Sequence, residues 1–124
     1  MNASAALVER LEDLLGVPLS PSENAKARLV LADTIGCMIG GLVDDEVAAL
    51  RSRLLPGDVT EGVTGVRHAP GDTAMLLGFA AAAQELDEGH YEAGGHPAAP
   101  VVAAVLAEVP GARAFDDHVI RAFV

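Results

Sequence analysis

Apolar side chains recur along the chain at intervals of three and four residues, which is the period of an α-helix with one buried side. The first such segment spans residues 5–15, and its apolar positions are Leu7, Leu11, Leu14 and Leu15. Gly16 favours a helix C-terminus, and Pro18 prevents the helix from resuming. The pattern therefore predicts a short amphipathic helix at the start of the chain.

The second helix is predicted by a clear N-terminal pattern. Ser20, Pro21 and Glu23 supply an N-cap, a proline at the first helical position and the acid of a capping box. The apolar positions that follow cover most of the helix surface: Leu29, Ala32, Ile35, Cys37, Met38, Ile39 and Leu42. Because this surface is too wide for a half-exposed helix, we expect the second helix to be central and buried.

Glycines inside predicted helices indicate where backbones come close together. A glycine costs about 1 kcal/mol relative to alanine in a helix interior. We therefore expect Gly36, Gly40 and Gly41 to permit close helix approach, or to end the second helix near Gly40. Gly78 predicts a similar close approach on a later helix.

Four more helices are expected, over residues 44–55, 72–83, 97–109 and from 114 onward. Asp72 is predicted to cap the fourth helix, and Pro97 or Pro100 to begin the fifth. Valines among threonines and glycines predict an extended loop or a short irregular strand over residues 59–70. Arg67 and His68 in this stretch are either solvated or part of a binding surface. The chain is thus predicted to be all-α, a bundle of roughly six helices.

Composition limits the classes of partner. The chain has 124 residues, enough for one domain, and 51% of them are hydrophobic, so a core can form. Its net charge is −10, from 18 acidic against 8 basic residues. This charge argues against a nucleic acid or an anionic membrane as partner. It also means that an anionic substrate would need cations from elsewhere.

The sequence predicts a cytoplasmic location and excludes an internal disulfide. The longest uncharged apolar run, residues 34–43, is too short and too rich in glycine to cross a bilayer. The first residues do not show a basic segment followed by an apolar one, so we expect a cytoplasmic protein. Cys37 is the single cysteine, which excludes an internal disulfide and indicates a buried thiol on a helix.

Groups that can move protons are concentrated in residues 84–100, which read QELDEGHYEAGGHPAAP. Within twelve residues the segment holds Glu85, Asp87, Glu88, His90, Glu92 and His96. Carboxylates beside imidazoles suit general acid/base catalysis near neutral pH. His96 is expected at the N-terminus of the fifth helix.

Two other interpretations of this segment remain open. His96 could only cap the fifth helix while the acids are solvated. The histidines and carboxylates could also bind a metal, although their spacing matches no zinc motif, so no metal ligand is assigned.

Three stretches of the sequence carry a family resemblance. ADTIGCMIGGL at 32–42, AAAAQELDEGH at 80–90 and GHPAAPVVAAVLAE at 95–108 resemble the N-terminal part of the MmgE/PrpD family. That family includes 2-methylcitrate dehydratase, cis-aconitate decarboxylase and iminodisuccinate epimerase. The resemblance runs through essentially the whole chain in order, and the combination of the three stretches is more specific than any one of them.

The resemblance implies a helical domain and proton transfer on di- or tricarboxylates without a redox cofactor. His96 stands at the position of an active-site histidine, and Glu85 and Asp87 stand at the first and second acid positions. These three residues are the predicted catalytic groups. Glu88 stands where aspartate is usual and Gly89 where some members have a substrate-contacting threonine. With His90, these two are the predicted substrate-binding residues.

Family enzymes run to several hundred residues and carry a smaller α+β lid domain. We therefore expect residues 1–124 to form a single, incomplete helical domain without the lid. A homo-oligomer or a complementing second chain would supply the missing cations. The predicted activity is dehydration of a small hydroxy-polycarboxylate. The alternatives are decarboxylation, epimerisation, or a non-catalytic helical half or truncated relic that only docks with another subunit.

Overall fold

The chain is all-α in a computed structural model that describes residues 3–54, 69–92, 94–109 and 116–123. The predicted fold class and number of helices are confirmed. Among the described residues, the only pairing of extended backbone is an isolated bridge between His90 and Gly95. The helices are α1 (Ala3–Gly16), α2 (Pro21–Gly41), α3 (Asp45–Leu54), α4 (Pro70–Ala82), α5 (Ala98–Glu108) and α6 (Asp117–Phe123).

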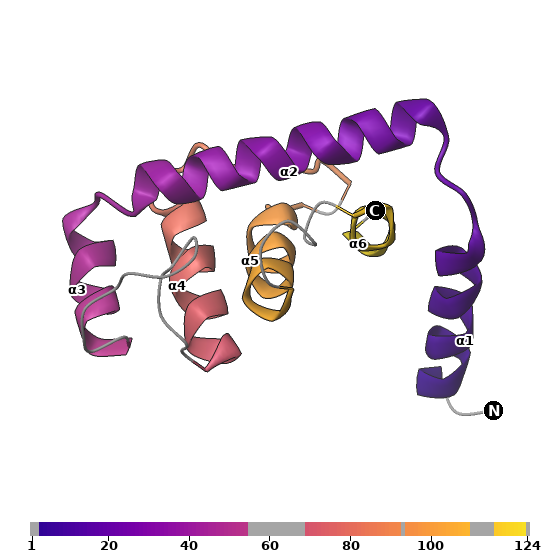
Figure 1. The fold of residues 1–124 in the computed structure, drawn as a ribbon, viewed down its shortest axis with the longest axis horizontal. Coiled ribbons are helices and arrows are strands. Elements are labelled where there is room, and N and C mark those ends of the chain that lie inside the picture. The colour runs from indigo at the N-terminus through magenta and orange to yellow at the C-terminus, as the bar shows by residue number, and fades with distance from the viewer. Residues whose placement is uncertain (1–2, 55–68, 93, 110–115, 124) are drawn as a thin grey trace.

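The longest helix, α2, runs along one side of the molecule, and α3, α4, α5 and α6 stand in a row against it (Figure 1). α2 packs against α4, α5 and α6, and α4 packs against both α3 and α5. α1 lies at the far end of α2, where its Leu7 and Val8 are exposed. The described part of the molecule is therefore one layer of helices beneath a single long helix.

The start of α2 has the predicted capping box. The Ser20 backbone N–H donates to Glu23 Oε2 over 2.7 Å, and the Glu23 N–H donates to Ser20 Oγ over 3.3 Å. Hydrogen bonds to the Glu23 carboxyl, first from the Ser20 side chain and then from the Ser20 backbone N–H, lower the pKa of that carboxyl. The reciprocal bonds satisfy donors that the first turn of a helix leaves without partners.

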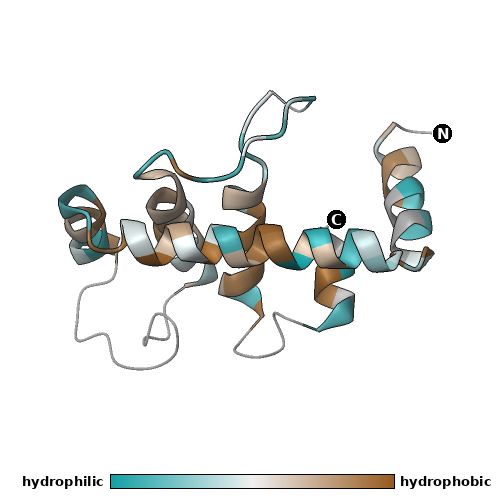
Figure 2. Cartoon of the chain, turned by 90° about the horizontal axis from the view of Figure 1, so that it is seen from above, coloured by the Kyte–Doolittle hydropathy of each residue, from teal (hydrophilic) through white to brown (hydrophobic). Residues whose placement is uncertain are grey.

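α2 has two apolar faces, which differ in their surroundings. The inner face is buried and consists of Ala27, Leu31, Thr34, Met38 and Gly41. The outer face is exposed and consists of Leu29, Ala32, Gly36 and Ile39, with Leu29 63% and Ile39 60% exposed. Brown apolar segments are visible along α2 when the molecule is viewed from above (Figure 2). α2 is central, as predicted, since α4, α5 and α6 all pack against it. Its expected burial is wrong for the outer face, because the described helices pack against the inner face.

The glycines of α2 also divide between these faces. A Cβ on Gly41 would lie far inside van der Waals contact of the Ala80 carbonyl oxygen on α4, so a close approach of two helices requires glycine there. A Cβ on Gly36 would meet nothing within 4 Å. Close approach is confirmed at Gly41 and is wrong at Gly36. The alternative, an end of the helix near Gly40, is also confirmed, since Gly41 is the last residue of α2. On α4, a Cβ at Gly78 would make an ordinary contact of 3.6 Å with Ala103 Cβ.

The buried side chains form two clusters. The larger lies between α2, α4, α5 and α6 and contains Ala27, Leu31, Met38, Leu77, Ala81, Ala98, Ala99, Val102, Ala103 and Ile120. The smaller lies between α3 and α4 and contains Val47, Leu76 and Ala80. Five of the ten residues of the larger cluster are alanines, so its helices approach closely. This close packing fixes the ends of α4 and α5, between which the candidate site lies.

Of two predicted helix starts, that of α4 differs from the prediction and that of α5 agrees with it. α4 begins at Pro70 with Ala69 as N-cap and no side-chain cap, so Asp72 lies in the first turn and is not the N-cap. Proline fixes a helical φ at the first position, which explains the earlier start. Pro97 is the N-cap of α5, as one of the two predicted alternatives had it. Arg67 and His68 lie outside the described residues.

Within the described residues, the structure has no helix that combines the length and apolar character needed to cross a membrane.

Candidate functional site

The candidate site is the segment of residues 83–97, which connects α4 to α5. Its first turn leaves α4 through the C-cap Ala83 and a 3.0 Å hydrogen bond from the Glu85 N–H to the Ala82 carbonyl. Glu85 has φ +52°, in the left-handed region that helix ends usually give to glycine. A side chain there costs about 1 kcal/mol or more. The exposed Glu85 therefore occupies a strained turn.

Gln84 ties this turn to α2. Its Nε2 donates to the Gly40 carbonyl oxygen over 3.2 Å, and a Cβ on Gly40 would come within 3.1 Å of Gln84 Oε1. Gln84 is not among the predicted site residues. Its only signal was its place directly after the alanine run of α4, which does not distinguish a tether from a solvated amide.

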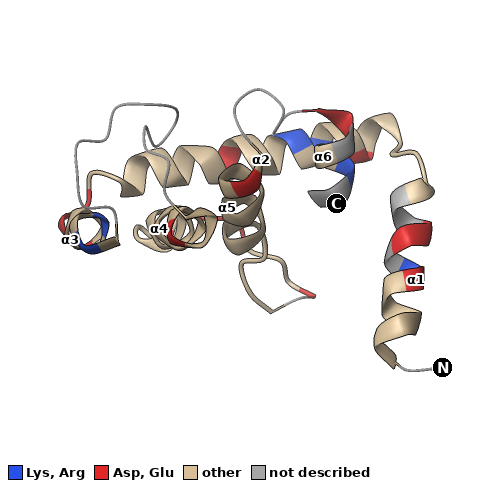
Figure 3. Cartoon of the chain, turned by 60° about the horizontal axis from the view of Figure 1, so that its bottom comes forward, with Lys and Arg blue, Asp and Glu red and all other residues tan. Residues whose placement is uncertain are grey.

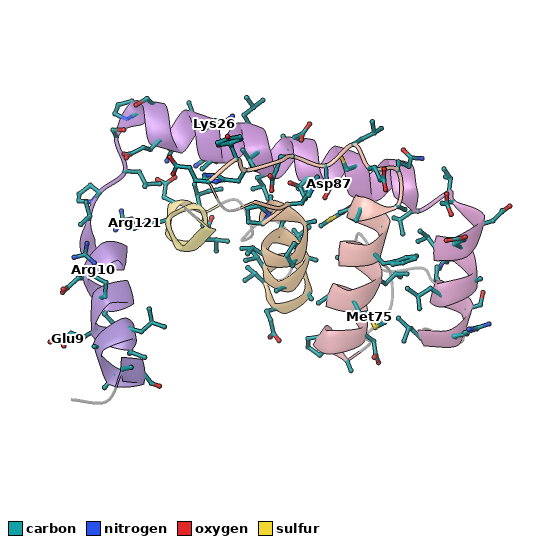
Figure 4. All side chains as sticks on the ribbon, turned by 180° about the vertical axis from the view of Figure 1, so that it is seen from behind. Glu9, Arg10, Lys26, Met75, Asp87 and Arg121 are labelled. Atoms are coloured by element: carbon teal, nitrogen blue, oxygen red, sulfur yellow. The ribbon has the colours of Figure 1, made fainter. Side chains whose placement is uncertain are left out.

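Asp87 and His96 are brought together by the return of the chain. His96 Nδ1 lies 3.4 Å from Asp87 Oδ2 and 3.3 Å from the Asp87 carbonyl oxygen. The Asp87 side chain is only 5% exposed, whereas that of His96 is 56% exposed. Figure 4 shows Asp87 between α2 and the start of α5. One nitrogen of an imidazole that remains open to solvent thus faces both the buried carboxylate and the backbone carbonyl oxygen of Asp87.

Glu88 contacts the start of α5. Its Oε1 accepts a hydrogen bond from the Ala98 backbone N–H, the first residue of the helix. Ala98 and its neighbour Ala99 are buried in the larger cluster. The side chain of Glu88 is thereby anchored to a fixed part of the core.

A backbone hairpin lies between the carboxylates of Asp87 and Glu88 and the imidazole of His96, and it reverses the direction of the chain. The His90 N–H donates to the Gly95 carbonyl oxygen over 2.8 Å, and the Gly94 N–H donates to the His90 carbonyl oxygen over 2.9 Å. Gly94 has φ +64°, which glycine adopts without a steric cost. The hairpin carries the chain back, so that His96 returns to Asp87.

The only cysteine lies beside this segment. Burial raises the pKa of the Cys37 thiol, and the negative charges of Asp33 and Asp87 raise that pKa further. The field of Asp87 therefore reaches α2 as well as α5.

The site region is acidic and contains no cationic side chain in its own segment. The sequence has no lysine or arginine between Arg67 and Arg113. Figure 3 accordingly shows red but no blue on α4, on α5 and on the described chain between them. Among the described residues, no three His, Cys, Asp or Glu side chains are grouped so that they could hold a metal ion.

The predicted site residues therefore fall into two groups. Asp87, His96 and Glu88 are joined to each other or to the start of α5. Glu85, Gly89 and His90 lie in the same segment with exposed positions. The catalytic and substrate-binding roles of all six stay predictions.

Comparison with protein families supports the sequence resemblance. The family model described as the MmgE/PrpD N-terminal domain matches residues 13–124. A search of curated proteins and a search of solved structures each found no significant match. The family match includes every helix from α2 to α6 and the whole candidate site. The chain belongs to the MmgE/PrpD family.

Proposed function

We propose that this chain provides the proton-transfer groups of a lyase of the 2-methylcitrate dehydratase type. The substrate is a small hydroxy-polycarboxylate, and the reaction uses acid/base chemistry without a redox cofactor. The contact between Asp87 and His96 carries this proposal, because it pairs a buried carboxylate with an accessible imidazole. A cytoplasmic location stays a prediction.

The geometry of that contact suggests which atom moves the proton. A neutral imidazole that donates its Nδ1 proton to a carboxylate has its lone pair on Nε2. In His96, Nε2 is then the basic atom, while Asp87 fixes the orientation and stabilises the charged ring. His96 takes the proton from the carbon next to a substrate carboxylate. Glu85 protonates the departing hydroxyl, so that water leaves and a carbon–carbon double bond forms.

Substrate binding needs positive charge that residues 68–112 do not contain. We propose that a second copy of the chain, or a complementing polypeptide, supplies it. The exposed outer face of α2 supports a partner, because Leu29 and Ile39 are apolar side chains left in water. Gly89 and His90 contact the substrate from this chain.

Decarboxylation and epimerisation on the same scaffold are the alternative reactions, since each also breaks a bond at a carbon next to a carboxylate. Their products differ from that of dehydration. Release of carbon dioxide would identify a decarboxylase, and inversion with deuterium incorporation from heavy water would identify an epimerase.

A non-catalytic helical half that only docks with another subunit is the second candidate function. The observation that favours it is again the exposed outer face of α2. It predicts that the chain binds a partner and that replacing His96 changes neither binding nor any activity.

The test is turnover of 2-methylcitrate, followed through the conjugated alkene product. The chain is assayed alone and after co-expression with its neighbouring reading frames. His96→Ala should lower the rate by about 100-fold or more. Glu92→Ala, an exposed acid of the same segment, is the matched control and should leave the rate unchanged. Absence of turnover in both preparations, or full activity of His96→Ala, would contradict the proposal.

A further inference from the structure

The start of α5 depends on a residue ten positions earlier in the chain. Its N-cap is Pro97, whose side chain cannot accept a hydrogen bond, so the N-cap residue itself provides no side-chain cap. The first N–H groups of a helix have no acceptor within the helix. Glu88 Oε1 accepts the N–H of Ala98 instead, and its negative charge suits the positive end of the helix dipole.

Asp87 and Glu88 are consecutive, and the groups that they hold are only two residues apart. Asp87 contacts the imidazole of His96, and Glu88 contacts the backbone of Ala98. The segment and the helix start are therefore joined at two neighbouring points. Loss of one contact would let the other shift, because only Pro97 separates His96 from Ala98.

We propose that Glu88 is a positioning residue for His96. Its carboxylate holds the first turn of α5 so that His96 Nδ1 faces Asp87, and it exchanges no proton with the substrate. As a statement about catalysis this assignment rests on the proposed function, whereas the coupling between Glu88, Ala98 and His96 does not.

The side chain of Glu88 therefore needs an acceptor oxygen and not a titratable proton. Glu88→Gln keeps an oxygen that can accept the Ala98 N–H, and Glu88→Ala removes it. A group that transfers protons would lose its function in both variants. The pair of variants thus separates a positioning role from a catalytic one.

The experiment is amide hydrogen exchange with NMR on the isotope-labelled chain. Local opening of the helix start governs the exchange of the Ala98 amide. In Glu88→Ala this exchange should become about fivefold faster or more, the effect of losing a helix cap. In Glu88→Gln and in the control Glu92→Ala it should stay within about twofold of the wild-type rate.

The second readout is the ring nitrogen spectrum of His96, which reports which nitrogen carries the proton. We expect Glu88→Ala to move His96 away from the Nδ1-protonated form, and Glu88→Gln to preserve that form. Unchanged Ala98 exchange in Glu88→Ala, or equal effects of the alanine and glutamine variants, would overturn the proposal.

A measurement on the wild-type chain covers the case in which Glu88→Ala does not fold. During a pH titration, the Ala98 amide proton resonance should move with the same midpoint as the carboxyl carbon of Glu88. An Ala98 resonance that does not follow Glu88 would overturn the proposal. None of these readouts needs turnover, so absence of turnover in both preparations would contradict the proposed lyase and leave the coupling between Glu88, Ala98 and His96 intact.

Discussion

The inner and outer faces of α2 have similar residues and opposite surroundings. Met38 on the inner face is 2% exposed, and its neighbour Ile39 on the outer face is 60% exposed. Gly41 on the inner face leaves no room for a methyl group, whereas Gly36 on the outer face leaves open space. An apolar residue therefore marks a surface of the helix that can be packed. Which of these surfaces is packed depends on the positions of the neighbouring helices.

The inner face also determines the geometry of the candidate site. It brings α4 against α2 at Gly41 and Ala80, and the next turn of chain is tied to α2 by Gln84 and Gly40. From there the segment continues to Asp87, His96 and the start of α5. Changes on the inner face should therefore disturb the site, and changes on the outer face should not.

The largest effect is expected from Gly41→Ala. The added methyl group would collide with the backbone carbonyl of Ala80, which cannot move without separating α2 from α4. We expect the free energy of unfolding to fall by about 3 kcal/mol or more. Urea denaturation measures it. A loss below about 1 kcal/mol would contradict the close approach.

Met38→Ala and Ile39→Ala compare adjacent residues on opposite faces. The first should cost about 2–5 kcal/mol, because it leaves a cavity in the larger cluster. The second should change stability by less than about 0.5 kcal/mol, because the side chain is mostly in water. Thermal or urea unfolding of both variants tests this. Equal losses would show that the outer face is packed in solution, as a bound partner would make it.

Gly36→Ala should have a smaller effect of the opposite sign. Alanine is favoured over glycine inside a helix by about 1 kcal/mol, and a Cβ here meets nothing within 4 Å. We expect a stabilisation of about 0.5–1 kcal/mol in unfolding experiments. A destabilisation would indicate that another molecule lies against this face.

The smallest effect concerns Cys37. Because burial and the charges of Asp33 and Asp87 raise the pKa of its thiol above that of free cysteine, the reactive thiolate should be scarce near neutral pH and its alkylation slow. Removing a nearby negative charge lowers this pKa and so accelerates alkylation at pH 8. Asp33→Asn should accelerate it by about twofold or more, and Asp87→Asn by somewhat less, since the charge of Asp33 acts more strongly. Iodoacetamide labelling followed by mass spectrometry measures the rates, and slower labelling of either variant would contradict the sign.

The helices were predictable from the sequence because their determinants are local. The capping box at Ser20 and the proline at Pro97 act within a single turn, and both are observed. The burial of α2 was not predictable, because apolar residues on both of its faces are compatible with one or two layers of packed helices.

The site was predictable as a segment, but its contacts were not. Residue types near His96 indicated acid/base chemistry, while the pairing of His96 with Asp87 depends on the hairpin at Gly94. The cap provided by Glu88 joins residues ten apart, and no local spacing rule describes it. Glu85 gave no sign of its left-handed backbone, since glycine or asparagine is the usual residue there.

The most direct test of the account is the protonation state of the His96 ring in the wild-type chain, measured by a long-range proton–nitrogen correlation spectrum. Free neutral imidazole of histidine prefers its proton on Nε2. The contact with Asp87 predicts the opposite form, with the proton on Nδ1 and a basic Nε2 facing solvent. Asp87→Asn should weaken this preference, and Glu92→Ala should preserve it. A neutral His96 that carries its proton on Nε2 in the wild-type chain would contradict the assignment of His96 as the base.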